Sequence, residues 1–201
     1  MSARPSTYAK TEDRKQEILS AALACFTEKG FAETTMKDVA RRSGASNGSI
    51  YHHFGAKEGL ARALYLSGIA EYQNTVAAGL TDKTDARRGV ESMITGHLSW
   101  VAENPGWARF LSTTRHAAFM ERADPEMAEL NRAWAGKIIA WHTARQGPGR
   151  LSPQPPVIFL SLILGPSQEL TRLWLAGVAQ GSPTDYADEL SRSAWQAVKA
   201  R

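Results

Sequence analysis

The polar residues of segment 47–53 are the part of this sequence where residue type and spacing point most directly to a chemistry. Ile50 and Phe54 are four residues apart, so they share one face of a helix. The other face carries an amide, hydroxyls and two imidazoles, with almost no aliphatic surface. Such groups hydrogen-bond to base edges and phosphate oxygens, so the pattern favours a helix that contacts DNA. The residues of this face are Asn47, Gly48, Ser49, Tyr51, His52 and His53.

Two short helices joined by a tight turn are needed to position this face. The first helix begins after Thr34 or Thr35, either of which can cap it, and runs to about Arg42. Gly44 follows where the chain must turn, because glycine adopts positive φ without strain. Ser46 is then placed as the N-cap of the second helix. This order of elements predicts a helix-turn-helix, and an ordinary helical hairpin inside a bundle is the alternative.

The stretch from Thr34 to Leu60 as a whole resembles the TetR family of bacterial transcriptional regulators. The match extends over many positions in the family's spacing, whereas a glycine-containing turn alone also fits the hairpin alternative. Ser43 and Ala45 depart from the family's usual Ala and Val, and both residues keep the turn small. The matching positions are Thr35, Val39, Ala40, Gly44, Ser46, Gly48, Tyr51, His53, Phe54, Lys57 and Leu60.

The resemblance implies roles for single residues. In the family's pattern the positions of Tyr51, His53 and Lys57 contact phosphates, and the N-terminal positions of the second helix face bases. Asn47 and Ser49 are therefore candidates for reading bases. The adjacent histidines do not predict a metal site, because neighbouring helical residues face different ways. Together with the outward-facing Lys37 and the polar face of the second helix, the predicted DNA-binding residues are Thr35, Lys37, Ser46, Asn47, Gly48, Ser49, Tyr51, His52, His53 and Lys57.

The charge of the chain is concentrated near this stretch. The 201 residues carry a net charge of +4, and the residues up to Lys57 hold nine Lys or Arg against six Asp or Glu. This modest basic bias is consistent with phosphate contact. The single Cys25 excludes an intrachain disulfide or a cysteine-based metal cluster. With no signal peptide at the start and no apolar run long enough to span a membrane, we expect a cytoplasmic protein without a cofactor.

The spacing of apolar residues predicts an all-α fold of about nine helices. Ile18, Ala22 and Phe26 form the buried stripe of a helix from about Thr11 to Gly30. Beyond the two short helices, further helices are predicted at about 57–80, 84–103, 105–114, 125–145, 156–179 and 184–199.

The composition changes along the chain, because all six tryptophans lie beyond residue 99. We predict a DNA-binding domain over residues 1–56, with 1–10 as a disordered arm. Residues 57–201 are then the domain for effector binding and dimerisation.

A mostly apolar pocket with a few polar groups is expected in the C-terminal domain. Small-molecule sites are built in this way, although aromatic stripes more often form a core. The TetR resemblance also implies a small apolar or amphipathic effector there. The candidate lining residues are Met93, His97, Trp100, Trp107, Phe110, Thr114, Phe119, Trp134, Ile138, Trp141 and Arg172.

A homodimer is expected from the segment 157–175, which is apolar on nearly every face. Such a helix must be buried on all sides, and here that requires a second chain. The TetR resemblance also implies a four-helix dimer interface and a palindromic operator. The candidate interface residues are Leu160, Leu164, Trp174, Leu190 and Trp195.

These observations predict a dimeric regulator, more specifically a repressor that a small ligand releases from double-stranded DNA. Three alternatives stay open. A DNA-organising protein of the same fold needs no effector, and a regulator that has lost its ligand acts through a protein partner. A helical enzyme would use His97, His116 and Glu121, but no nucleophile–base spacing or phosphate-binding loop supports it.

Overall fold

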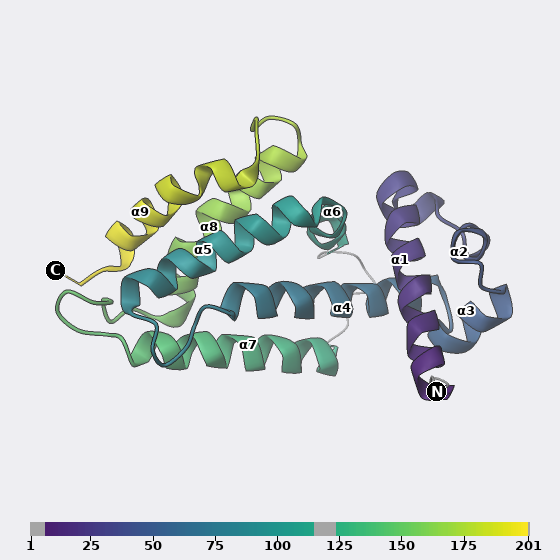
Figure 1. Cartoon of the computed structure of the whole chain (residues 1–201), viewed down its shortest axis with the longest axis horizontal. Coiled ribbons are helices and arrows are strands. Elements are labelled where there is room, and N and C mark those ends of the chain that lie inside the picture. The colour runs from purple at the N-terminus through teal and green to yellow at the C-terminus, as the bar shows by residue number, and fades with distance from the viewer. Residues whose placement is uncertain (1–6, 115–123, 201) are drawn as a thin grey trace, which may run out of the picture. The chain divides into compact units, whose positions relative to one another are not determined.

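The structure, a computed structural model, describes residues 7–114 and 124–200, with side chains described from residue 11 onward (Figure 1). These residues form helices joined by short loops, and the extended pairing among them is limited to isolated bridges at Gln146–Leu151 and Leu151–Lys199. The helices are α1 (Thr7–Glu33), α2 (Met36–Ser43), α3 (Asn47–Phe54), α4 (Lys57–Ala77), α5 (Ala86–Glu103), α6 (Pro105–Thr114), α7 (Pro125–Thr143), α8 (Pro156–Leu175), the 3₁₀ helix η2 (Pro183–Tyr186) and α9 (Ala187–Val198).

The predicted all-α fold is confirmed, and each predicted helix has a counterpart in the described residues. The start of α1 was predicted wrongly. It begins at Thr7, so residues 7–10 are helical backbone and do not belong to an arm. Gly30 interrupts α1 with φ 81° and ψ 164°, which agrees with the predicted helix end at this glycine. Proline begins α6, α7 and α8, where its missing N–H costs no hydrogen bond.

The described residues divide into two compact units. The N-terminal unit contains residues 7–68 and 109–114, and the C-terminal unit contains residues 69–108 and 124–200. The chain therefore passes from one unit to the other within the continuous helices α4 and α6. The functional boundary predicted at residue 56 stays a prediction.

The core of the N-terminal unit is formed by the inner faces of its helices. Ile18 and Phe26 of α1 are buried with Val39 of α2 and Ile50 of α3. Phe110 of α6 stacks on Phe26 with 5.8 Å between ring centroids. The inner face of α3 is thereby fixed, and its opposite face is left outside the core.

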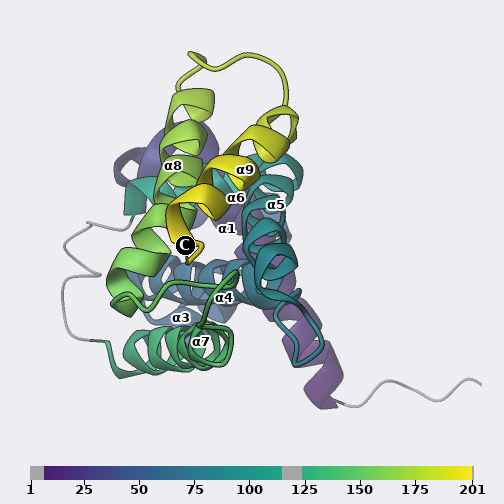
Figure 2. The ribbon, with the colours of Figure 1, turned by 90° about the vertical axis from the view of Figure 1, so that its left-hand side faces the viewer.

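The core of the C-terminal unit is centred on α5, which packs against α8 and α9 (Figures 1 and 2). The expectation that α8 is buried on all sides does not hold within one chain. Phe159, Ile163 and Leu164 face the core, whereas the side chains of Val157 and Ile158 are exposed. Within the described residues, no helix has the length and apolar character of a membrane span.

Candidate nucleic-acid interface

The helix-turn-helix of α2 and α3 is held by its capping side chains. Thr35 is the N-cap of α2, since its hydroxyl oxygen accepts from the backbone N–H of Asp38 at 3.2 Å. Asp38 in return accepts from the backbone N–H of Thr35 at 3.0 Å, which completes a capping box. The Ser46 hydroxyl accepts from Ser49 N–H at 3.1 Å and caps α3 in the same way. The DNA contacts expected of Thr35 and Ser46 stay predictions.

The turn between these helices takes the predicted conformation. Gly44 has φ 66° and ψ 9°, the left-handed region in which a side chain is strained. The two caps and this glycine together fix where α3 starts. Because each N-cap contributes about 1 kcal/mol, the start of α3 is defined locally as well as by packing.

The outer face of α3 is exposed as predicted. Ile50 is fully buried, while Asn47, Gly48 and His52 are exposed. Tyr51 is 50% exposed, and Ser49 and His53 are partly exposed. The polar groups expected to read DNA are therefore accessible in the free chain, and their contact with DNA stays a prediction.

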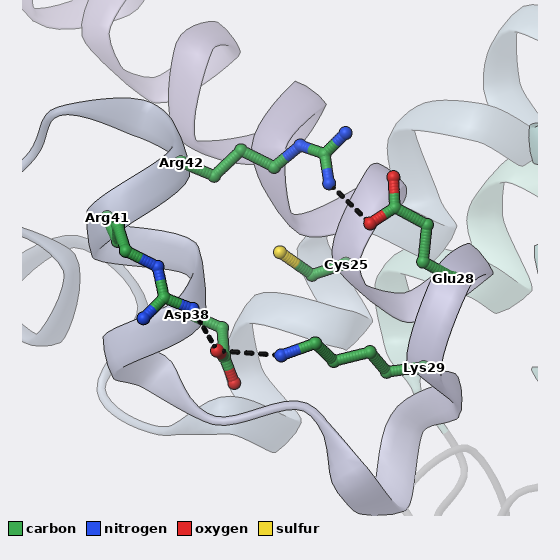
Figure 3. A pocket seen from close by; sticks show the side chains of 6 residues that line it. All are labelled: Cys25, Glu28, Lys29, Asp38, Arg41 and Arg42. Atoms are coloured by element: carbon green, nitrogen blue, oxygen red, sulfur yellow. Dashed lines mark hydrogen bonds and ion pairs between the residues drawn. The ribbon is translucent and has the colours of Figure 1, made fainter.

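A polar hollow of about 280 Å³ lies between α1 and α2 (Figure 3). Its rim consists of ion pairs that join the two helices. Lys29 Nζ donates to Asp38 Oδ1 at 2.8 Å, and Arg42 donates to Glu28 at 2.6 Å. The hydrogen bond from Lys29 lowers the pKa of Asp38 well below its ordinary value, so this carboxylate stays charged. Arg41 also donates to Asp38, at 2.7 Å.

Cys25 lies among these charged side chains (Figure 3). The residue is buried, and burial raises the pKa of its thiol above the ordinary value. A raised pKa keeps the sulfur protonated and unreactive. Cys25 is therefore a packed core thiol.

Lys57 occupies a position that its expected role does not explain. Its ammonium donates to the carbonyls of Phe31 at 2.9 Å, Ala32 at 3.1 Å and Thr34 at 3.0 Å. The nitrogen also lies 4.6 Å from the centroid of the Phe31 ring. The three N–H groups of a lysine are all engaged by these carbonyls. These contacts belong to the free chain, and the phosphate contact implied by the resemblance stays a prediction.

The residues expected to line an effector pocket are not all in one place. Met93, Ile138 and Trp141 belong to the buried cluster of the C-terminal unit, together with partly buried Trp134. Phe110 is instead a core residue of the N-terminal unit, where it stacks on α1. Trp100 and Thr114 are buried, and Trp107 is partly buried. Phe119 lies outside the described residues.

Arg172 is a surface residue, contrary to its predicted place in an apolar pocket. Its side chain is exposed and pairs with Glu169 one helical turn away. The hydrogen bond from Arg172 lowers the pKa of Glu169. The prediction that Arg172 lines an apolar pocket is therefore wrong.

A buried polar network connects α4, α5 and α8 in the C-terminal unit, and of its members only His97 was singled out from the sequence. His97 Nδ1 lies 2.9 Å from the hydroxyl of Tyr72, and Nε2 lies 2.9 Å from that of Thr171. Thr171 itself donates to the Ser167 carbonyl at 3.0 Å, so Nε2–H must donate to Thr171 and Nδ1 must accept from Tyr72. Burial lowers the pKa of His97 to about 4.

One sequence signal could have found part of this network. Ser167 and Thr171 are polar and four residues apart, so they lie on the same face of their helix. Their partner Tyr72 gave no such signal, because it lies on a different helix. Both ring nitrogens of His97, which the enzyme alternative named, have hydrogen-bond partners within this network. The other two residues of that alternative, His116 and Glu121, lie outside the described residues.

The residues expected at the dimer interface are either buried in the core of their own chain or partly buried. Leu164 is 4% exposed and belongs to the core of its own unit, so its place in the predicted interface is wrong. Leu160, Leu190 and Trp195 are partly buried against the same core. Trp174 is partly buried and donates its indole N–H to the Gly181 carbonyl at 3.0 Å. The exposed apolar residues of α8 are Val157 and Ile158.

Comparison with known proteins gives one consistent result. Residues 18–64 match the family model of bacterial regulatory proteins, tetR family. The chain is 27% identical to the HTH-type transcriptional repressor AcnR of Corynebacterium efficiens over 189 residues, 92% of each chain. It is 30% identical to the HTH-type transcriptional repressor KstR2 of Rhodococcus jostii over 136 residues, which is 63% of this chain and 64% of that protein.

Solved structures show the same fold over nearly the whole chain. A TetR family transcription regulator from Marinobacter aquaeolei superimposes with a TM-score of 0.81 at 20% identity, covering 97% of this chain and 100% of that one. The transcriptional regulator FadR of Bacillus subtilis, solved in complex with stearoyl-CoA, gives a TM-score of 0.70 at 15% identity and covers 89% and 96%. At such identities the likeness establishes the fold.

Proposed function

This chain belongs to the TetR family of bacterial transcriptional regulators, and we propose that it is a repressor that leaves a palindromic operator when a small, largely apolar ligand binds. The observation that carries the proposal is the outer face of α3. It is polar, exposed and held at its start by the Ser46 cap. A helix presented in this way enters a major groove and hydrogen-bonds to base edges.

The reading of sequence is assigned to the first turn of α3. Asn47 is exposed there, and an amide can pair with adenine through two hydrogen bonds. Tyr51 and His53 lie farther along the helix and are assigned to phosphates. Phosphate contacts position the helix, and base contacts select the operator.

A homodimer is part of the proposal, because two-fold symmetry sets two recognition helices about 34–36 Å apart on a palindrome. We assign its contact surface to the outer side of α8. Val157 is 68% exposed and Ile158 is 47% exposed, which favours their burial by a second chain. Ser161 and Gly165 follow on the same side, and a Cβ at Gly165 would meet no atom within 4 Å. Small residues at this point permit close approach of a partner helix.

The effector is assigned to the interior of the C-terminal unit. This interior is largely apolar, and its polar network around His97 is uncharged at neutral pH. A neutral or amphipathic ligand suits such surroundings better than an ion, because an unpaired charge is costly to bury. The ligand acts only if it prefers one conformer of the protein, and α4 is the element assigned to transmit the change, since it begins directly after α3.

The experiment that tests the proposal is selection of bound sequences from a random duplex pool at near-physiological salt. Enrichment of a palindrome with two half-sites is the expected result. Binding that is weak, salt-sensitive and without sequence preference would refute the assignment as a sequence-specific repressor.

A further inference from the structure

We propose that the polar hollow between α1 and α2 binds a small, multiply charged oxyanion such as phosphate, held by the side chains of Lys29, Arg41 and Arg42. The site is separate from the proposed function. Among the described residues, those that line the hollow include none of the predicted DNA contacts. Lys37, a predicted DNA contact on α2, is exposed and lies outside this lining.

The hollow carries an excess of positive charge. Three cationic side chains and two carboxylates line it around one thiol. Such an excess in a small concave site raises the local concentration of anions. Its volume of about 280 Å³ is at the lower end of the range for small-molecule sites, which suits a ligand of few atoms. The lining residues are Cys25, Glu28, Lys29, Asp38, Arg41 and Arg42.

Two ion pairs cross between the helices in opposite directions at this hollow (Figure 3). Lys29 of α1 donates to Asp38 of α2 at 2.8 Å, and Arg42 of α2 donates to Glu28 of α1 at 2.6 Å. In the view of Figure 3 the Cys25 side chain lies between the two pairs. An anion bound over this sulfur lies between the ammonium of Lys29 and the guanidinium of Arg42.

The three cations have N–H groups left for such an anion. A lysine has three N–H groups and an arginine has five. The hydrogen bonds to carboxylates engage one nitrogen of each cation, namely Nζ of Lys29, Nη2 of Arg41 and Nη1 of Arg42. Arginine presents its N–H groups in a planar fork that matches two oxygens of a phosphate or carboxylate. An oxyanion is therefore the ligand that suits this set of donors.

The two carboxylates of the hollow differ in how firmly they are held. Asp38 accepts hydrogen bonds from Thr35, Lys29 and Arg41, and its side chain is only 14% exposed. The Glu28 side chain is 54% exposed and pairs with Arg42. An incoming anion therefore competes with Glu28 for Arg42 and leaves Asp38 in place.

A bound anion connects α1 to the helix-turn-helix. Lys29 belongs to α1, whereas Arg41 and Arg42 belong to the last turn of α2. A ligand that binds only the folded arrangement of these side chains stabilises it by mass action. The concentration of the anion then tunes the stability of the unit that carries α3.

The test is a titration of the full-length protein with inorganic phosphate, followed by two-dimensional NMR of backbone amides and arginine Nε–H groups. Sodium chloride keeps the ionic strength constant, because salt screens exposed charges. The signals of residues 25–29 and 38–42 should shift and reach saturation at millimolar phosphate. Shifts that do not saturate, or that chloride reproduces, would reduce the effect to screening and overturn the proposal.

Two variants remove the same ion pair and should act in opposite directions. Arg42→Gln removes a charged donor and should weaken phosphate binding about tenfold. Glu28→Gln removes the competing carboxylate and should tighten binding several-fold. Equal weakening in both variants would mean that only the structure of the hollow had changed, and the binding site would be refuted.

Arg87→Gln is the control for these variants. Arg87 forms an exposed pair with Glu91 on α5, at 2.9 Å, and does not line the hollow. Its loss should leave the phosphate titration of residues 25–29 and 38–42 unchanged. A loss of affinity equal to that of Arg42→Gln would contradict a localised site.

A second titration distinguishes a free anion from a phosphate group of DNA. Inorganic phosphate is added in the presence of saturating random-sequence duplex at the same ionic strength. The proposal requires that the signals of residues 25–29 still shift with a similar affinity. If the duplex alone produced these shifts and abolished the titration, the hollow would belong to the DNA interface and the proposal would be wrong. Failure to select an operator refutes the proposed function instead and leaves the phosphate titration unaffected.

Discussion

The hydroxyl of Tyr72 lies 2.9 Å from Nδ1 of His97 and donates its hydrogen to this nitrogen, inside the C-terminal unit. The imidazole is 4% exposed and has hydroxyl and carbonyl partners, with no carboxylate among its hydrogen-bond contacts. Burial therefore lowers the pKa of His97 to about 4 and keeps the ring neutral.

The first prediction concerns the stability of the fold against pH. Between about pH 6.5 and pH 4 the unfolded chain binds a proton at His97 and the folded chain does not. The free energy of unfolding should consequently fall as the pH falls through this window, by up to about 3 kcal/mol from this residue. Denaturant unfolding of the wild type and of His97→Gln at pH 7 and pH 4.5 measures the difference.

The comparison with His97→Gln is needed because burial also lowers the pKa of His142. Both proteins keep His142, so the loss that remains in His97→Gln comes from other groups. An equal pH dependence in the two proteins would contradict the predicted state of His97.

The second prediction is that Tyr72→Phe destabilises the fold by about 1–2 kcal/mol, because it leaves the buried Nδ1 of His97 without a donor. Tyr186→Phe is the matched control. It removes a phenol hydrogen bond of the same length, 2.9 Å to the Gln180 carbonyl, at an exposed site. Thermal unfolding should show a clear loss for Tyr72→Phe and little change for the control, and equal losses would speak against a network that depends on burial.

The third prediction separates folding from DNA binding at Gly48. A Cβ built there would meet only the Ser46 hydroxyl, at 3.9 Å, so the fold has room for alanine. Alanine should stabilise the helix by about 0.5–1 kcal/mol. It should nevertheless weaken operator binding, because its methyl group keeps the backbone away from DNA.

Gly136→Ala is the control for this variant. Gly136 is an exposed helical glycine of α7, and a Cβ there would meet no atom within 4 Å. The two variants should gain similar thermal stability, and only Gly48→Ala should lose affinity in a DNA titration. If Gly48→Ala bound the operator with unchanged affinity, the DNA would not approach the backbone closely at this position.

The fourth prediction concerns the dimer. Ile158→Asp should give a folded monomer in analytical sedimentation, because this residue is exposed in the single chain and covered by the proposed partner. Leu164→Ala should instead destabilise the fold by about 2–5 kcal/mol, since it removes a buried core side chain. A dimer that persists in Ile158→Asp at low concentration would move the interface away from this side of α8.

The fifth prediction assigns base reading and backbone contact to two residues of α3. Asn47→Ala should change the preference at one position of each operator half-site, as measured by repeating the sequence selection. Tyr51→Phe should weaken binding to all sequences by a similar factor, because the hydroxyl is assigned to a phosphate. A uniform loss in Asn47→Ala would remove it from the base-reading residues.

The helix-turn-helix was predictable from the sequence because its signals are local. Gly44 and Ser46 act within a few residues of where they stand, and the spacing of Ile50 and Phe54 shows which face of α3 is buried. The capping role of Thr35 was foreseen as one of two choices. Its partner Asp38, three residues later, is the signal that decides between them.

The position of Lys57 could not be predicted in the same way. Its partners are backbone carbonyls 23 to 26 residues earlier in the chain, and a carbonyl group leaves no mark on the sequence. The burial of Leu164 was equally hidden. The first half of α8 is apolar on all sides, so the pattern there does not indicate which side faces the core, and only packing against α5 and α9 decides it.

The side chains of Asn47 and His52 take no part in the hydrogen bonds and ion pairs that hold the described residues of α2 and α3 together. The caps, Gly44 and the ion pairs of Asp38 keep α3 in place whatever residues stand at these positions. On the proposed assignment of Asn47 to base reading, mutations there should change the operator that is chosen at little cost to folding. Duplicated copies of such a gene are free to diverge toward new promoters while they keep the same scaffold, and an engineer can retarget the protein by the same route.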